Sequence, residues 1–184
     1  METKISRASK ALSNGEPARA KRLLEQVLRS DPKNIEALWM ISRLYESRNA
    51  LEDWLASLTR LRELLPDELY ILDELARAYA KTKRLDQSVV LYREFLNKQP
   101  ESLNAKYNLA HYLARIGEYD EAIDLYEVLL ENNASDAEEI HLNLSKLLSE
   151  SLNRNEESRE HLTEALKINP DYVPAWFNLG NLNE

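Results

Sequence analysis

Residues 103–132 read LNAKYNLAHYLARIGEYDEAIDLYEVLLEN, and this stretch decides the fold. Large apolar residues recur in it at steps of three and four, which places them on one face of an α-helix. The pattern is interrupted once, at Ile116-Gly117, where a turn is expected. The stretch therefore predicts two amphipathic helices joined by a short turn.

Prolines mark a period of 34 residues around this stretch. Pro32, Pro66 and Pro100 are evenly spaced, Pro170 falls two periods and two residues later, and Ala134 stands where another proline is expected. Each proline ends an amphipathic run, because it lacks a backbone N–H and clashes with the preceding helical turn. A period of this length indicates a repeat protein.

Pairs of a Leu or Ile with a very small residue recur at the same period. Another small residue usually opens each second helix, because antiparallel helices approach closely only where neither presents bulk. The pairs are Ile41-Ser42, Leu75-Ala76, Leu109-Ala110, Leu144-Ser145 and Leu179-Gly180, and the opening residues are Ala20, Ser88, Ala122 and Ser158. Trp54 takes the opening position in the second repeat, so we expect the helices there to splay or a neighbouring side chain to give way.

This pattern resembles the tetratricopeptide repeat family, whose signature has an aromatic residue, a Leu–Gly pair, Tyr, Ala, an aromatic residue and Pro at these spacings. Residues 175–181, AWFNLGN, match the family's opening helix almost letter for letter. The resemblance implies an all-α fold, a right-handed α-solenoid of antiparallel helix pairs with five repeats and the first helix of a sixth. We expect a single superhelical domain over 1–184, with repeats at about 1–34, 35–68, 69–102, 103–137 and 138–172 and a partial repeat at 173–184.

The expected first helices span about 2–13, 35–47, 69–81, 103–115 and 138–151, and the second helices about 17–30, 51–64, 85–98, 119–132 and 155–168. A last helix begins near Pro174. One additional residue near Asn153–Asn155 predicts a longer turn inside the fifth repeat. Because the apolar last helix has no partner before Glu184, we expect a fragment of a longer protein; alternatively, Trp176 and Leu179 cap the fifth repeat.

Composition excludes several classes of function. The chain has no cysteine, which excludes disulfides and thiolate metal sites, and its net charge of −8 argues against nucleic acid as the partner. The N-terminus has no secretory signal, and no apolar run approaches the roughly 20 residues that cross a bilayer. We therefore expect a cytoplasmic protein that does not bind membranes.

A column of asparagines precedes the Leu–small pairs of the last three repeats. Asn108, Asn143 and Asn178 are each 35 residues apart. The family resemblance implies that first helices line a concave groove, and a carboxamide can donate to and accept from the backbone of an extended peptide. The column is similar to the asparagine ladder of protein O-linked N-acetylglucosamine transferase, although Met40 and Glu74 hold the corresponding positions in earlier repeats. The alternative is that these asparagines are merely solvated.

Basic and aromatic residues share this helix face and complete the expected ligand-binding groove. A basic column predicts an acidic peptide or a free C-terminal carboxylate as ligand; the alternative is that these cations pair with neighbours such as Glu46 or Glu74. Aromatic residues would supply apolar anchors. The basic candidates are Arg43, Arg77, His111, Lys146, Lys81 and Arg115, and the aromatic candidates are Trp39, Tyr70, Tyr107 and Phe177.

No catalytic residues, metal ligands or cofactor site are expected. The three histidines, His111, His141 and His161, lack metal-ligand spacing, and three glycines cannot form a phosphate-binding loop. The favoured function is a scaffold that binds an extended peptide or protein segment, which the basic column predicts to be acidic. The alternatives are the substrate-recruiting part of a larger enzyme, such as a glycosyltransferase or sulfotransferase, and self-assembly into a homo-oligomer through the exposed last helix.

Overall fold

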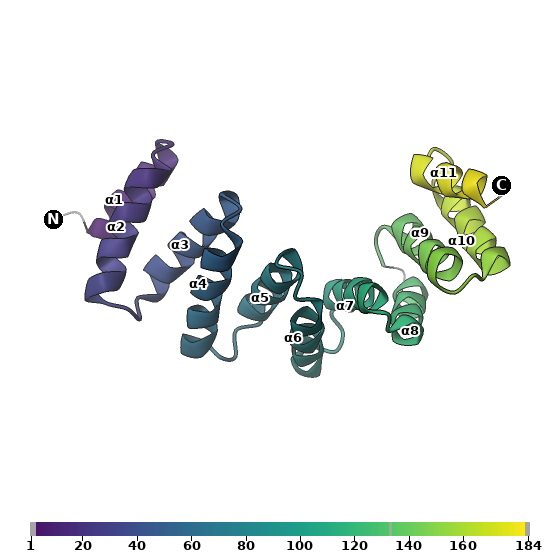
Figure 1. Ribbon diagram of the computed structural model, residues 1–184, viewed down its shortest axis with the longest axis horizontal. Helices are drawn as coiled ribbons and strands as arrows, with labels where there is room; N and C mark the ends of the chain where they lie inside the picture. The colour runs from purple at the N-terminus through teal and green to yellow at the C-terminus, as the bar shows by residue number, and fades with distance from the viewer. Residues whose placement is uncertain (1–2, 133, 183–184) are drawn as a thin grey trace. The chain divides into compact units, whose positions relative to one another are not determined.

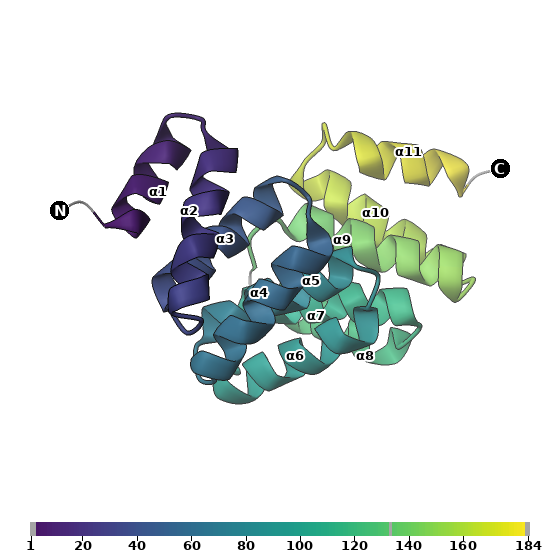
Figure 2. The same cartoon turned by 60° about the vertical axis from the view of Figure 1, so that its left-hand side comes forward.

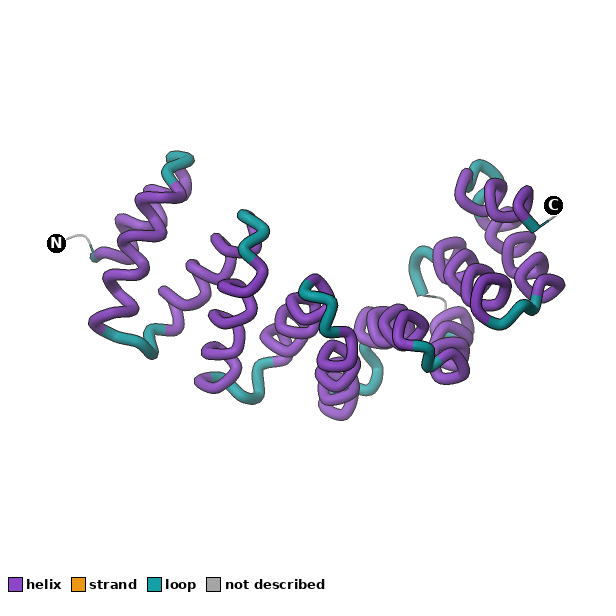
Figure 3. The backbone as a smooth tube through the Cα atoms, viewed as in Figure 1, coloured by secondary structure: helices purple, strands orange, loops and turns teal. Residues whose placement is uncertain are grey.

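A computed structural model describes residues 3–132 and 134–182, in which the regular structure is entirely helical (Figures 1 and 3). This confirms the predicted fold class and, to within two residues, nearly every predicted helix boundary. Residue 2 of the expected first helix lies outside the described residues. The helices are α1 (Lys4–Ser13), α2 (Pro17–Ser30), α3 (Ile35–Ser47), α4 (Leu51–Leu64), α5 (Leu69–Lys81), α6 (Leu85–Lys98), α7 (Leu103–Ile116), α8 (Tyr119–Glu131), α9 (Ala137–Lys146), α10 (Asn155–Ile168) and α11 (Val173–Asn181).

The chain forms two compact units, residues 1–95 and 96–184, each with its own buried apolar clusters. In the first unit, α1 to α5 pack as successive neighbours. In the second, α7 packs on α8, α8 on α9 and α9 on α10, and α11 lies against α9 and α10 in both views (Figures 1 and 2). The single superhelical domain stays a prediction.

The recurring small residues let paired helices meet. Ser88 is fully buried where α6 crosses α5, and its hydroxyl donates to the Ala76 carbonyl at 2.7 Å. In the fifth repeat the hydroxyls of Ser145 and Ser158 lie 2.8 Å apart and are buried. Trp54 is also fully buried, in a cluster with Leu and Ile side chains, and the Lys81 ammonium lies 5.0 Å from the centre of its ring.

Each turn inside a repeat contains one residue with positive φ. These residues are Gly15, Asn49, Lys83, Gly117 and Asn153. Glycine adopts this left-handed conformation without strain and asparagine tolerates it, whereas lysine has no such advantage. The turns therefore share one geometry, and the lysine is the residue least suited to it.

The additional residue of the fifth repeat lies inside its first helix, so the predicted longer turn is wrong. The helix ends in a π-helical turn, Leu147–Ser151, and three residues connect it to α10, as in most other repeats. The Arg154 amide donates to the Leu148 carbonyl, six residues back, whereas the Ala50 amide donates to the Tyr45 carbonyl, five residues back. A π turn absorbs one residue without ending the helix and keeps both Leu147 and Leu148 buried.

Candidate functional site

The groove between α7 and α9, in the second unit, gathers five of the thirteen predicted binding residues: Tyr107, His111, Arg115, Asn143 and Lys146. Two hollows lie along it, of about 260 Å³ and about 210 Å³. The larger is lined partly by Asp136 and Glu139, and the smaller partly by Arg115 and Lys146. We call this surface the α7–α9 groove; its two ends carry opposite charges.

Tyr107 connects the two helices at the middle of the groove. Its hydroxyl donates to Glu139 Oε1 at 2.9 Å and accepts from Asn143 Nδ2 at 3.0 Å. Its ring meets the buried ring of Tyr126 edge to face, with centroids 6.1 Å apart. Burial, together with the hydrogen bond to the Glu139 carboxylate, raises the pKa of Tyr107 to about 12. The phenol therefore stays protonated and holds the Asn143 amide in place.

The smaller hollow brings together four residues predicted from the sequence: His111, Arg115, Asn143 and Lys146. In the part of the chain that the structure describes, no carboxylate forms an ion pair with Arg115 or Lys146. Partial burial and the charge of Arg115 lower the pKa of His111, so its ring is neutral at pH 7. Among the described residues that line the hollow, Glu150 is the one acidic residue, so the hollow carries a net positive charge.

Sequence reasoning missed Glu139, Glu150 and Ser151 at this site. Glu150 and Ser151 reach the hollow from the π-helical turn. The additional residue of the fifth repeat was visible in the sequence and was the available signal. Because the sequence prediction placed this residue in a turn and not in the helix, it did not predict that Glu150 and Ser151 line the hollow.

The three asparagines of the predicted column are not equivalent. The Asn143 amide is bonded to Tyr107, and Asn178 Nδ2 donates to the Pro174 carbonyl of its own helix at 2.9 Å. Asn108 is half-buried and, among the described residues, has no hydrogen-bond partner for its side chain. A ladder of three equivalent amides stays a prediction, and in this conformation the Asn108 side chain alone is uncommitted.

Arg43 and Arg77, in the first unit, are held by carboxylates. Arg43 lies 2.8 Å from Glu46 and 3.5 Å from Glu74, and Arg77 lies 2.8 Å from Glu74 and 3.8 Å from Asp73. Burial disfavours the charge of Arg77, but these carboxylates outweigh it and raise its pKa. This face of the first unit therefore has no surplus positive charge, as the alternative interpretation supposed.

The predicted aromatic anchors differ in exposure. Trp39 and Tyr70 meet edge to face with ring centroids 5.1 Å apart, and Tyr70 is 44% exposed. On α11, Trp176 is 56% and Phe177 68% exposed, whereas Leu179 packs partly against the core. Tyr107 is committed to the groove wall by its hydrogen bonds, whereas Phe177 is largely exposed.

The described residues contain neither a metal-binding cluster nor a helix that could span a membrane. Over residues 3–132 and 134–182, no three His, Cys, Asp or Glu side chains are grouped to hold a metal ion. No helix within those ranges has both the length and the apolar content needed to span a membrane. His141 and His161 form a pair, with their Nδ1 atoms 2.9 Å apart.

Comparison with known proteins agrees with the helix-pair architecture. Family models described as Tetratricopeptide repeat match residues 11–72, 74–137 and 138–172. The chain is similar to a tetratricopeptide repeat protein from Parabacteroides merdae, at 19% identity and a TM-score of 0.82 over 97% of this chain and 70% of that one. A search of curated proteins finds no match.

Two further solved structures share the architecture. YrrB, described as a TPR protein with an unusual peptide-binding site, has 17% identity and a TM-score of 0.79 over 95% of this chain and 89% of its own. MamA from Desulfovibrio magneticus has 15% identity and a TM-score of 0.75 over 90% and 92%. At these identities the likeness shows the fold alone.

Proposed function

Because the chain belongs to the tetratricopeptide repeat family, we propose that it is a scaffold that binds a partner polypeptide, and that the α7–α9 groove holds an extended, acidic segment of that partner. The observation that carries the proposal is the hollow in which Arg115 and Lys146, both without an ion-pair partner among the described residues, lie beside Asn143. No catalytic step, cofactor or nucleic acid is part of the proposal, and the cytoplasmic location stays a prediction.

The dimensions of the groove suit a short extended segment. α7 has 14 residues and is therefore about 21 Å long at 1.5 Å per residue, which corresponds to about six residues of extended chain. An acidic side chain of the ligand fits the hollow at Arg115 and Lys146. The side-chain oxygen of Asn143, Oδ1, accepts a hydrogen bond from a backbone N–H of the peptide. Asp136 and Glu139, at the other end, would repel a ligand that is acidic throughout and so favour one direction of binding.

The expected affinity is modest. Exposed charge pairs contribute about 0.2–1 kcal/mol each, and backbone hydrogen bonds about 0.5–1.5 kcal/mol each. Association first costs about 4–15 kcal/mol in lost freedom. A micromolar dissociation constant that weakens with salt is therefore the expected result.

The test compares two labelled peptides by fluorescence anisotropy. One carries two aspartates near its C-terminus, and the other carries asparagines there. Wild type should prefer the aspartate peptide, and Lys146→Glu should abolish that preference. Lys33→Glu, an exposed position in the first unit, changes the net charge equally and should leave the preference intact. Equal effects of the two variants would show that the overall charge of the protein, and not the hollow, sets the difference between the two peptides.

The amide contribution is tested separately. The triple variant Asn108→Ala/Asn143→Ala/Asn178→Ala should weaken both peptides alike, because amides contact the backbone of either one. Unchanged binding of both peptides would remove the asparagine column from the proposal while leaving the charged hollow in place.

Self-association is a second candidate function, favoured by Trp176 and Phe177, which are 56% and 68% exposed on α11. Exposed apolar side chains of this size are typical of interaction surfaces. Light scattering of the purified chain, with and without Trp176→Asp, measures the mass directly. A mass that the variant does not change would count against assembly through α11.

A further inference from the structure

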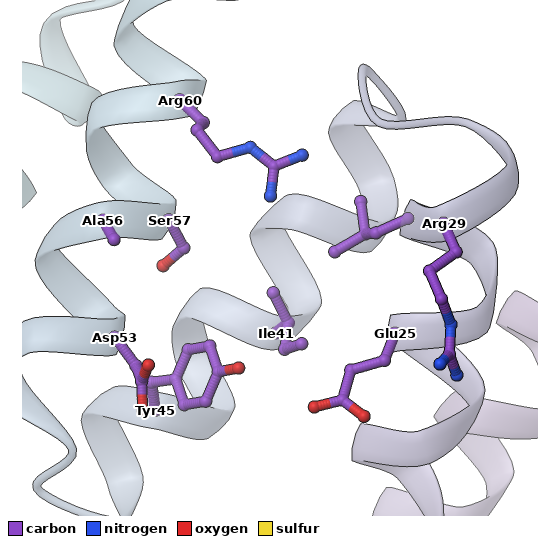
Figure 4. Close-up of a pocket in the computed structure, with 9 residues that line it drawn as sticks. Glu25, Arg29, Ile41, Tyr45, Asp53, Ala56, Ser57 and Arg60 are labelled. Atoms are coloured by element: carbon purple, nitrogen blue, oxygen red, sulfur yellow. The ribbon is translucent and has the colours of Figure 1, made fainter.

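A hollow of about 450 Å³ lies within the first unit, outside the predicted groove, between α2, α3 and α4 (Figure 4). None of the binding residues predicted from the sequence lines it. Leu28, Ile41 and Tyr45 supply an apolar floor, and charged side chains stand on the walls formed by α2 and α4. We call this hollow the α2–α4 cleft.

The α4 wall places opposite charges at the two ends of the cleft. Figure 4 shows Arg60 reaching into the cleft at one end, while Asp53 lies beside Tyr45 at the other. A hydrogen bond from the Arg60 guanidinium to the Pro32 carbonyl, 2.6 Å long, orients the arginine. Seven residues separate Asp53 from Arg60 along α4, a rise of about 10 Å.

Both end charges are available to a ligand. No ion pair holds Asp53 or Arg60 within the stretches that the structure describes. Glu25, on the α2 wall, is different: its carboxylate lies 3.7 Å from the Lys21 ammonium, which also covers the Tyr45 ring at 5.0 Å. Arg29, also on the α2 wall, has no ion-pair partner among the described residues either. The α4 wall thus presents one uncompensated anion and one uncompensated cation, Asp53 and Arg60, about two helical turns apart.

We propose that the α2–α4 cleft docks an α-helix of a partner protein, with an acidic and a basic side chain seven residues apart and an apolar side chain between them. On a helix, seven residues are two turns, so both charges fall on one face and about 10 Å apart, matching Arg60 and Asp53. An apolar residue three or four positions from either charge lies on the same face and covers the floor.

An extended segment fits the same charges less well. It would cover 10 Å in about three residues, and side chains three apart on a strand point to opposite faces. It could therefore direct only one of its two charges into the cleft. The α2–α4 cleft is built from α2, α3 and α4. The proposal for it therefore does not depend on the function proposed for the α7–α9 groove.

The test uses three synthetic helical peptides, each alanine-rich with one central leucine and two charged positions seven apart. One carries glutamate and lysine, the second two lysines, and the third two glutamates. Fluorescence anisotropy at 150 mM salt should give the tightest binding for the mixed peptide, with each like-charge peptide about two- to fivefold weaker. Net charge alone would rank the two-lysine peptide first, because the protein carries −8.

Charge-reversal variants then test the two ends. Arg60→Glu should prefer the two-lysine peptide and Asp53→Lys the two-glutamate peptide, while Glu63→Lys, an exposed position on α4 outside the cleft, should keep the wild-type order. Circular dichroism checks that each variant is folded. The proposal is overturned if wild type binds all three peptides equally or binds none at millimolar concentration, or if neither reversal changes the order more than Glu63→Lys does.

Discussion

Replacing Lys83 by glycine should stabilise the protein. Lys83 lies in the turn between α5 and α6 with φ of 62°, at the position that Gly15 and Gly117 hold in the first and fourth repeats. Its side chain is exposed and, in the described part of the chain, makes no hydrogen bond or ion pair. The substitution therefore changes backbone strain and removes little else.

The magnitude follows from two opposing effects. A residue with a β-carbon in the left-handed region costs about 1–2 kcal/mol, and Lys83→Gly removes this cost. Glycine also gains freedom in the unfolded chain, which costs about 0.5–1 kcal/mol on folding. The net expectation is a free energy of unfolding higher by up to about 1.5 kcal/mol, or a Tm higher by up to about 6 °C for a protein of this size.

The assay is urea unfolding followed by helical circular dichroism, with Lys83→Ala as the matched control. Alanine removes the same charge and side chain but keeps the β-carbon, so its unfolding midpoint should equal that of wild type or fall slightly below it. The strain argument is refuted if Lys83→Ala gains as much stability as Lys83→Gly, or if Lys83→Gly unfolds at less urea than wild type.

Three further predictions concern packing, hydrogen bonding and pH. Ser88→Leu should lower the free energy of unfolding by about 1–3 kcal/mol in urea titrations, because the larger side chain has no room at the α5–α6 crossing. Tyr107→Phe should cost about 1–2 kcal/mol by the same measurement, because Asn143 and Glu139 each lose a partner. Burial lowers the pKa values of His141 and His161 below 6.5, so the unfolded chain takes up more protons as pH falls from 7.5 to 5.5, and the urea midpoint should fall with it.

Each of these three predictions has a control variant. Gln87→Leu places the same leucine on the exposed side of α6 and should leave stability unchanged, as should Tyr70→Phe, whose hydroxyl has no hydrogen bond within the described residues. Changing both His141 and His161 to glutamine should make the pH dependence shallower. A pH dependence as steep in this double variant as in wild type would assign the effect to other groups.

The pH prediction depends on all the charges around the histidine pair. Glu164 on α10 favours the protonated form of both rings, and Glu157, Glu160 and Glu127 favour protonation of His161, but burial outweighs them. One proton can be shared across the 2.9 Å separation of the two Nδ1 atoms, whereas a second would bring two positive rings together. Near the lower end of the pH range the unfolded chain binds a proton on each histidine, whereas the folded pair binds at most one. The loss of stability with falling pH should therefore be steepest there.

Patterns that repeat in the sequence predicted the fold well, because one physical reason acts at every copy. The prolines predicted where second helices end, and the small residues predicted where helices cross, as the buried hydroxyl of Ser88 confirms. Gly117 predicted a turn that the structure contains, with φ of 91°. Lys83 takes the same conformation without any residue preference for it, so the turn at this position followed from the period alone.

Features present in one copy were harder to predict. The additional residue of the fifth repeat could lie in a turn or in a helix, and only the burial of both Leu147 and Leu148 favours the π-helical turn. The hydrogen bonds of Tyr107 join it to residues 32 and 36 positions away in the sequence, so no local sequence pattern predicts them. The α2–α4 cleft is likewise formed by three helices whose lining residues share no sequence motif.

One position explains why the predicted basic column differs between the third and fifth repeats. In the third repeat Glu74 precedes the Leu–small pair, and because it lies three residues before Arg77 on the same helix, its carboxylate reaches the guanidinium at 2.8 Å. In the fifth repeat the equivalent residue is Asn143, which has no charge to offer Lys146. Between these two repeats, the residue type at this position thus accounts for whether the cation is paired within the fold or remains available to a partner. Arg43 in the second repeat follows Met40 and is paired instead with Glu46 of its own helix. The asparagines matter to the α7–α9 groove as much for the charge they lack as for the hydrogen bonds they can form.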